Sequence, residues 1–124
     1  ERSRGLGDVY KRQELLKEYL PNIVKNSANS NIYVIDNNSN DGSQSYILNS
    51  FPSVRLIKNE KNYGYAEGYN LALQEVKADY YALINSDVKT TPNWLDPLVL
   101  FLEEHADYSA VQPKILDQND FSKL

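Results

Sequence analysis

Helix-like and strand-like segments alternate along most of this chain of 124 residues. Apolar residues at helical spacing predict helices over about residues 14–26 and 65–76. A short helix is expected around residues 46–48 and a last helix over 92–104. A short, nearly continuous apolar run predicts a strand covered on both faces at 32–35. Further short runs predict strands at 54–57 and 80–84, and Val111 marks a last short strand. Such alternation is typical of an α/β layer structure with a mostly parallel sheet and right-handed crossovers.

Two prolines suggest where the first and last of these helices bend or begin. Pro21 lies inside the apolar stripe of the first helix, so we expect a kink there or two shorter helices. Thr91 and Pro92 have the pattern of an N-cap and a first helical residue, which predicts that the last helix starts at this point.

The composition excludes several classes of function. A net charge of -4 and the lack of a dense Lys and Arg stretch argue against a nucleic-acid partner. The chain has no cysteine, which excludes a thiolate nucleophile and a disulfide framework and is typical of a reducing compartment. No apolar run approaches the roughly 20 residues that cross a bilayer. We therefore expect one cytoplasmic domain without a membrane span, which in a longer protein would lie at the cytoplasmic membrane face.

The first 13 residues differ in character from the rest of the chain. They mix charged residues without an apolar segment, so they are not a signal peptide. Residues 3–13 resemble the conceptual translation of a transposon-based sequencing adapter. We therefore expect residues 1–13 to be an artefactual, disordered tail and residues 14–124 to be the domain, the alternative being a native flexible arm.

Polar loops follow three of the predicted strands directly. They contain Asp36 and Asn37, residues 59–64, and residues 85–87. In open parallel sheets, ligands bind beyond the carboxyl ends of the strands, where such loops meet. We therefore expect these three loops to form one site.

Several segments of the chain, in order and with familiar spacing, resemble the family 2 glycosyltransferases of GT-A type. The segments that carry the resemblance are Val34–Ser43, Asn59–Asn70, Asp79–Val88, Trp94–Leu95 and Gln112–Lys114. The last two sit where rhamnosyltransferase-like members of the family have them. The resemblance spans about residues 14–116, which makes it more specific than any single motif.

The resemblance implies that Asp36 and Asn37 read the nucleotide of a bound donor. The alternative for both is that they cap the following helix as Asx residues. We expect Asp41, which stands before Gly42 and Ser43, to serve the turn and the helix start.

Gly64 and Gly68 frame a helix start that can bring backbone N–H groups near a phosphate or a sugar. Close packing of helix on sheet is the alternative reason for both glycines. Asn62 and Asn70 share this ambiguity, because each can reach the donor sugar or satisfy the loop backbone.

Asp87 is the candidate metal ligand. A diphosphate leaving group develops negative charge, which Mg²⁺ or Mn²⁺ held by one carboxylate can neutralise. Family members often carry Asp-x-Asp here, whereas this chain has Asn85, as rhamnosyltransferase-like branches do. A plain turn residue is the alternative for Asp87. His105, the only histidine, is expected at a solvated helix end without a catalytic role.

The resemblance implies a partial Rossmann-like nucleotide-sugar-binding domain whose first strand, before Glu14, is missing. It implies an inverting hexosyltransferase of polysaccharide biosynthesis that uses Mg²⁺ or Mn²⁺, a nucleoside-diphosphate sugar and a saccharide or lipid-linked saccharide acceptor. The general base is expected beyond Leu124, so the fragment should be inactive alone. The implied donor-binding residues are Asp36, Asn37, Asn62, Gly64, Gly68, Asn70, Asn85 and Asp87.

Two other classes of protein stay open. A sugar-nucleotide nucleotidyltransferase also combines an α/β sheet with a metal-held carboxylate, but its N-terminal loop rich in Gly and Arg is absent here. A noncatalytic receiver-like domain would use Asp36 as a phosphoacceptor. Lys114 fits that class loosely, and the acidic cluster it needs near the chain start is lacking.

Overall fold

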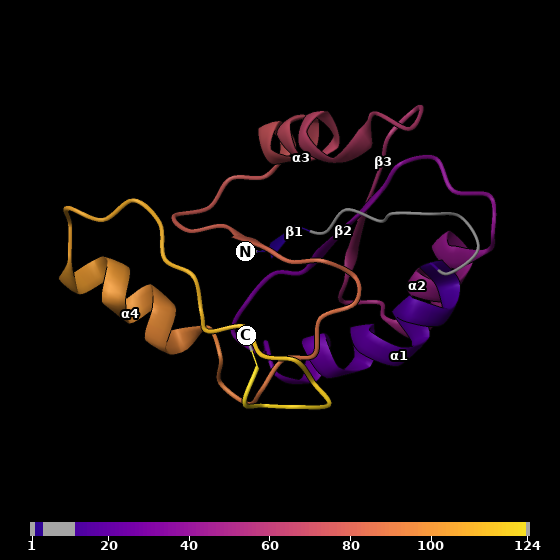
Figure 1. Cartoon of the computed structure of the whole chain (residues 1–124). Helices are drawn as coiled ribbons and strands as arrows, with labels where there is room; N and C mark the ends of the chain where they lie inside the picture. Colours follow the sequence, from indigo (N-terminus) through magenta and orange to yellow (C-terminus); the bar gives the residue numbers. More distant parts are fainter. Residues whose placement is uncertain (1, 4–11, 124) are drawn as a thin grey trace.

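The computed structural model describes residues 2–3 and 12–123 of the chain (Figure 1). Helices and strands alternate through most of this part. The elements are β1 (Arg2–Ser3), α1 (Arg12–Lys25), β2 (Tyr33–Asp36), α2 (Ser43–Ser50), β3 (Arg55–Lys58), α3 (Gly64–Glu75), β4 (Ala82–Leu83) and α4 (Asp96–Glu104).

The strands pair in parallel, as expected. β2 pairs with β3 from Tyr33 opposite Arg55 to Asp36 opposite Lys58, and β1 pairs with β4. The backbone N–H of Asn59 extends the first pairing by donating to the carbonyl of Asp36, at 2.8 Å. The prediction of an α/β fold with a parallel sheet is confirmed.

β2 lies between two helical layers, which explains its continuous apolar sequence (Figure 1). Val34 packs with residues of α1 and α2 such as Leu16 and Ile47. Its neighbour Ile35 packs on the opposite side, with Tyr69 and other residues of α3. Successive side chains of a strand point to opposite faces, so a strand covered on both faces needs apolar residues at every position.

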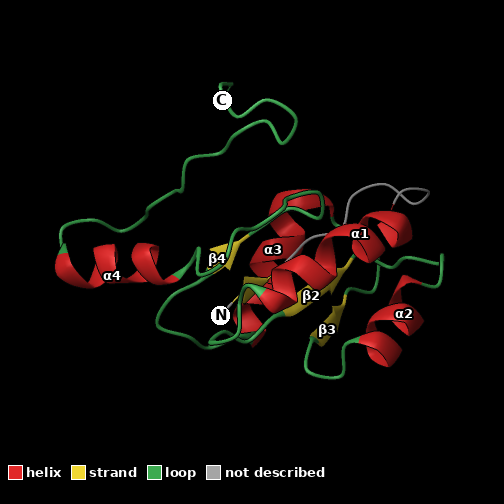
Figure 2. Ribbon diagram, turned by 90° about the horizontal axis from the view of Figure 1, so that it is seen from below, coloured by secondary structure: helices red, strands yellow, loops and turns green. Residues whose placement is uncertain are grey.

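A third cluster attaches the segment after β4 to α1. Tyr19 and Ile23 of α1 pack with Ile84, and Val88 and Trp94 cover this contact. The chain that leaves β4 therefore runs against α1, and it then continues into α4. Figure 2 shows α4 extending away from the other elements, and none of its residues is buried.

Two pieces of the first 13 residues belong to regular elements, contrary to the expectation of a wholly disordered tail. Arg2 and Ser3 form β1, which pairs with β4 and also contacts β2 and α3, and α1 begins at Arg12. This pairing gives hydrogen-bond partners to backbone N–H and C=O groups that would be unpaired at an open strand edge. A short strand therefore precedes α1, where we expected the first strand to be missing. Residues 1 and 4–11 lie outside the described residues.

Three further expectations are corrected. α1 continues through Pro21, whose exposed position lets water reach the carbonyl that the proline leaves unpaired. α4 begins at Asp96 instead of Pro92, because Asn93 has a left-handed backbone with φ of 56° that interrupts a right-handed helix. Val111 belongs to no strand, since no strand within residues 2–3 and 12–123 pairs with it.

Candidate functional site

Asp36 ends β2 as a fully buried carboxylate with both oxygens engaged. Its Oδ1 accepts hydrogen bonds from the backbone N–H of Ser39, at 3.1 Å, and from the Ser39 hydroxyl. Its Oδ2 accepts from Nε2 of Gln44 in the first turn of α2. These bonds hold the loop after β2 and the start of α2 against the end of the strand.

Asn37 links three chain segments at the same edge of the sheet. Its side chain is buried, and its Nδ2 donates to the carbonyl of Gly64 at the start of α3, at 3.1 Å. Its Oδ1 accepts from Nδ2 of Asn59, which directly follows β3, at 2.7 Å. Two of the three strand-end loops therefore meet at Asn37, as the sequence predicted for parallel strands.

The start of α3 has a shape that depends on its two glycines. Gly64 has a left-handed backbone with φ of 74°, and its N–H donates to Oδ1 of the exposed Asn62, at 2.9 Å. A Cβ atom at Gly68 would lie 3.0 Å from Oδ1 of Asn37. The structure thus gives Gly68 the packing role that was the alternative to phosphate binding, and its role toward a donor stays a prediction.

Asp41 serves the turn before α2, which confirms its expected role. Its Oδ1 accepts from the N–H of Ser43, at 3.1 Å, and from the Ser43 hydroxyl, at 2.5 Å. Gly42, with φ of 81°, lies between them and allows the tight turn.

The remaining site candidates are on the surface. Asn70 on α3, and Asn85 and Asp87 after β4, have exposed side chains. The hydroxyl of Tyr69 on α3 donates to the carbonyl of Ile84, which directly follows β4, at 3.4 Å. The structure joins the first two loops by hydrogen bonds, whereas no hydrogen bond or ion pair within the described residues joins Asp87 to Asp36 or Asn37. His105 is exposed at the end of α4, as expected.

The candidate metal ligand is the single carboxylate of Asp87. Asp87 is exposed in the turn after β4, and its carboxylate has no hydrogen bond or ion pair with a described residue. No group of three or more His, Cys, Asp or Glu side chains in the described ranges is placed to hold a metal ion. Mg²⁺ is often bound by one or two carboxylates together with phosphates and waters, so one free carboxylate is compatible with that arrangement.

Three residues that shape this site were not among the predicted site residues, although Asn59 begins a loop that was expected there. Asn59 follows a strand directly, so the strand-end rule that selected Asp36 applies to it equally. Ser39 and Gln44 are ordinary polar residues of a loop and a helix start, and only the folded loop brings them to Asp36.

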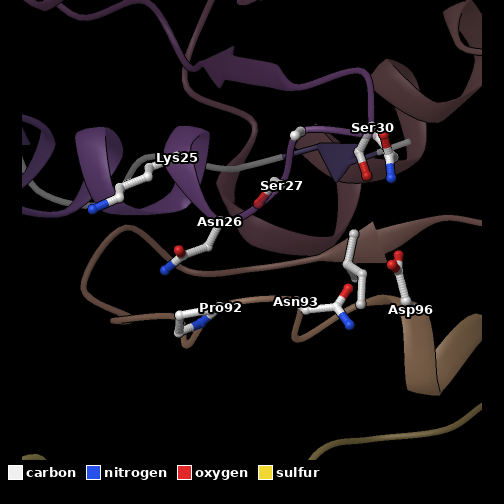
Figure 3. Close-up of a pocket in the computed structure, with 10 residues that line it drawn as sticks. Lys25, Asn26, Ser27, Ser30, Pro92, Asn93 and Asp96 are labelled. Carbon is white, nitrogen blue, oxygen red and sulfur yellow. The ribbon is translucent and has the colours of Figure 1, made fainter.

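A shallow pocket of about 220 Å³ lies elsewhere in the fold (Figure 3). Residues 25–30, which precede β2, and residues around Pro92 and Asn93 line it. It is therefore at the opposite end of β2 from Asp36 and is separate from the candidate site.

Comparisons with known proteins identify the family. Residues 8–123 match the model of Glycosyl transferase family 2, and the chain belongs to this family. The match begins inside the segment set apart above as a tail.

Two curated relatives carry glycosyltransferase names. EpsE from Bacillus subtilis (strain 168), provisionally described as a glycosyltransferase, is 28% identical over 91% of this chain and 42% of its own length. An uncharacterized glycosyltransferase from Haemophilus influenzae is 24% identical over 83% of this chain and 33% of its own. The chain spans less than half the length of these relatives.

Solved structures share the fold. The mannosyltransferase PcManGT from Pyrobaculum calidifontis, in complex with GDP-Man and Mn2+, superposes with a TM-score of 0.61 at 20% identity over 78% of this chain and 33% of its own. S. aureus TarS 1-349 in complex with UDP superposes with a TM-score of 0.68 at 18% identity. The superposition covers 86% of this chain and 33% of the TarS chain. The fold of this chain is thus that of a GT-A glycosyltransferase domain. None of the helices in the described part is long and apolar enough to cross a membrane.

Proposed function

We propose that this chain is the donor-binding part of an enzyme that transfers a sugar from a nucleoside-diphosphate sugar to a hydroxyl acceptor. The observation that carries the proposal is the meeting of Asp36 and Asn37 with the start of α3, at the carboxyl end of parallel strands in a family 2 chain. Ligands of open α/β sheets bind at this edge.

The buried end of β2 supplies the part of the site that faces the nucleoside. Asp36 is held by Ser39 and Gln44, so its position is fixed before a ligand arrives. A loop fixed in this way loses little conformational freedom on binding, so we propose that the loop after β2, held by the buried Asp36, recognises a base or ribose. The proposed side of the site toward the diphosphate and sugar is formed just before and along the first part of α3, by Asn62, Gly64, Gly68 and Asn70.

Asp87, next to Asn85 on the exposed turn after β4, is the proposed ligand of Mg²⁺ or Mn²⁺. The cation, when bound, supplies Lewis-acid stabilisation of the negative charge on the leaving diphosphate. The relationship to PcManGT, whose structure contains GDP-Man and Mn2+, supports a nucleotide-sugar donor and a metal.

The finer features of the reaction follow the family resemblance. We propose transfer of a hexose with inversion to a saccharide or lipid-linked saccharide acceptor, as part of polysaccharide biosynthesis. The reaction needs a general base for the acceptor hydroxyl. Asp36 is unsuited to that role because both of its oxygens already accept hydrogen bonds within the protein. We place the base beyond Leu124 in a longer protein, and we expect no sugar transfer from this chain alone.

The alternative of a receiver-like domain is disfavoured by the same carboxylate. A phosphoacceptor must be reached by its phosphate donor, whereas Asp36 has an exposed fraction of 0%. No observation favours a nucleotidyltransferase over a glycosyltransferase.

Calorimetric titration of the chain with UDP, GDP and ADP tests the proposed function, with Mn²⁺ and then with EDTA. We expect saturable binding of at least one nucleoside diphosphate, stronger with Mn²⁺ than with EDTA. Absence of binding to all three in the presence of Mn²⁺ would contradict the proposal.

A further inference from the structure

The side chain of Asn37 has both ends of its amide engaged within the protein. Its Nδ2 donates to the carbonyl of Gly64 and its Oδ1 accepts from Nδ2 of Asn59, at 3.1 and 2.7 Å. A backbone carbonyl can only accept, so the group that faces Gly64 must be the donor, and this fixes the orientation of the amide. The side chain is 6% exposed, which leaves little of it open to a ligand.

The amide of Asn37 also packs against α3 at Gly68, a position that has no side chain. An added Cβ at Gly68 would lie 3.0 Å from Oδ1 of Asn37 and 3.2 Å from its Nδ2. Gly64, which accepts the hydrogen bond, lies one helical turn earlier. The position of α3 on the end of β2 therefore depends on the Asn37 amide and on the missing side chain at Gly68.

We propose that Asn37 is a positioning residue, which fixes the loop of residues 59–64 and the first turn of α3 and acts on the donor through them. The binding part of this inference rests on the proposed function. An amide is required because the position must donate to Gly64 and accept from Asn59 at once, and an ionised carboxylate cannot donate. This role differs from direct reading of the nucleotide, which the family resemblance implied for Asn37.

The substitution Asn37→Asp tests the proposal because it changes one group and almost no volume. It places a carboxylate oxygen against the carbonyl of Gly64, where two acceptors repel each other. Asn38→Asp is the matched control, since it makes the same change one residue further on an exposed side chain. Hydrogen exchange over residues 59–70 is measured in the free protein, and the affinity for UDP and GDP is measured with Mn²⁺.

We expect Asn37→Asp to speed exchange over residues 59–70 and to weaken nucleotide binding, each by about tenfold, the order expected for one buried hydrogen bond. Asn38→Asp should leave both quantities at the wild-type level. A loss of affinity with unchanged exchange would mean that Asn37 touches the nucleotide directly and would overturn the proposal. Unchanged exchange with unchanged affinity would overturn it as well.

Gly68→Ala gives a second test that keeps the amide. Alanine favours a helix more than glycine does, so slower exchange is expected if only helix propensity matters. We expect faster exchange over residues 59–70, because the new Cβ displaces the Asn37 amide. In the Asn37→Ala background the same Gly68→Ala substitution should not speed exchange, since no amide remains to be displaced.

The exchange and binding measurements separate this inference from the proposed function. If the wild-type protein binds no nucleoside diphosphate, the proposed function fails, while the exchange data still decide whether Asn37 positions α3. If Asn37→Asp does not fold, Gly68→Ala alone and in the Asn37→Ala background decide the question. Slower exchange in Gly68→Ala would overturn the proposal.

Discussion

The Asn22 side chain in α1 accepts a hydrogen bond from the backbone N–H of Thr90, at 2.7 Å, although 68 residues separate them. The same Oδ1 also accepts from the Thr90 hydroxyl, at 2.9 Å. Directly after the end of α1, Nδ2 of Asn26 donates to the carbonyl of Thr90, also at 2.9 Å. These bonds hold the segment that follows Asp87 against α1.

We expect Asn22→Ala to lower the free energy of unfolding by about 1–3 kcal/mol, because it leaves the buried N–H of Thr90 without an acceptor. Urea denaturation followed by circular dichroism measures the change. Asn29→Ala, on an exposed loop position, is the control and should change stability by no more than about 0.5 kcal/mol. Equal stability of the two variants would show that Asn22 does not hold Thr90 in solution.

The core between α1, α2 and β2 should be sensitive to loss of volume. Leu16 is fully buried there, so Leu16→Ala should destabilise the protein by about 2–5 kcal/mol through lost burial and a residual cavity. Leu48 on α2 has an exposed fraction of 54%, and Leu48→Ala should cost far less. Thermal unfolding compares the two, and a similar loss in both would argue against the packing of α1 on β2.

The hydroxyl of Tyr81 joins the end of α3 to the segment before β4. It donates to the carbonyl of Val76 at 2.7 Å and accepts from the N–H of Ala78 at 3.1 Å. Tyr81→Phe should therefore cost about 0.5–1.5 kcal/mol in urea denaturation. Tyr108→Phe makes the same change on an exposed ring and should be neutral, so a neutral Tyr81→Phe would remove this connection from the fold.

The sequence predicted the buried strand β2 well because its pattern depends only on local composition. A strand between two helical layers must be apolar at each position, and residues 32–35 show this directly. The start of α4 could not be located, because the left-handed backbone of Asn93 comes just after Thr90, which is held on α1 by Asn22 far away in the sequence. The single apolar residue Val111 predicted a strand, but a strand exists only where another strand pairs with it.

The candidate site was predictable to the extent that it depends on strand ends. Asp36, Asn37 and Gly64 could be placed together because loops at the carboxyl ends of parallel strands converge. Their roles could not be predicted in the same way. The packing of Asn37 on Gly68 depends on how closely α3 lies to the end of β2, and only the folded structure gives that distance. Gln44 gave no signal, because its contact with Asp36 depends on the left-handed turn at Gly42.

Asp87→Asn tests the central claim most directly, because it removes the charge of the proposed metal ligand and keeps its size. Calorimetry with Mn²⁺ and the nucleoside diphosphate that binds the wild-type protein gives the affinity of each variant. Asp107→Asn and His105→Ala are controls, since both residues are exposed near the end of α4. We expect Asp87→Asn to weaken the Mn²⁺-dependent binding by about tenfold or more while both controls bind as the wild type does. Equal affinity of Asp87→Asn and the controls would contradict the account.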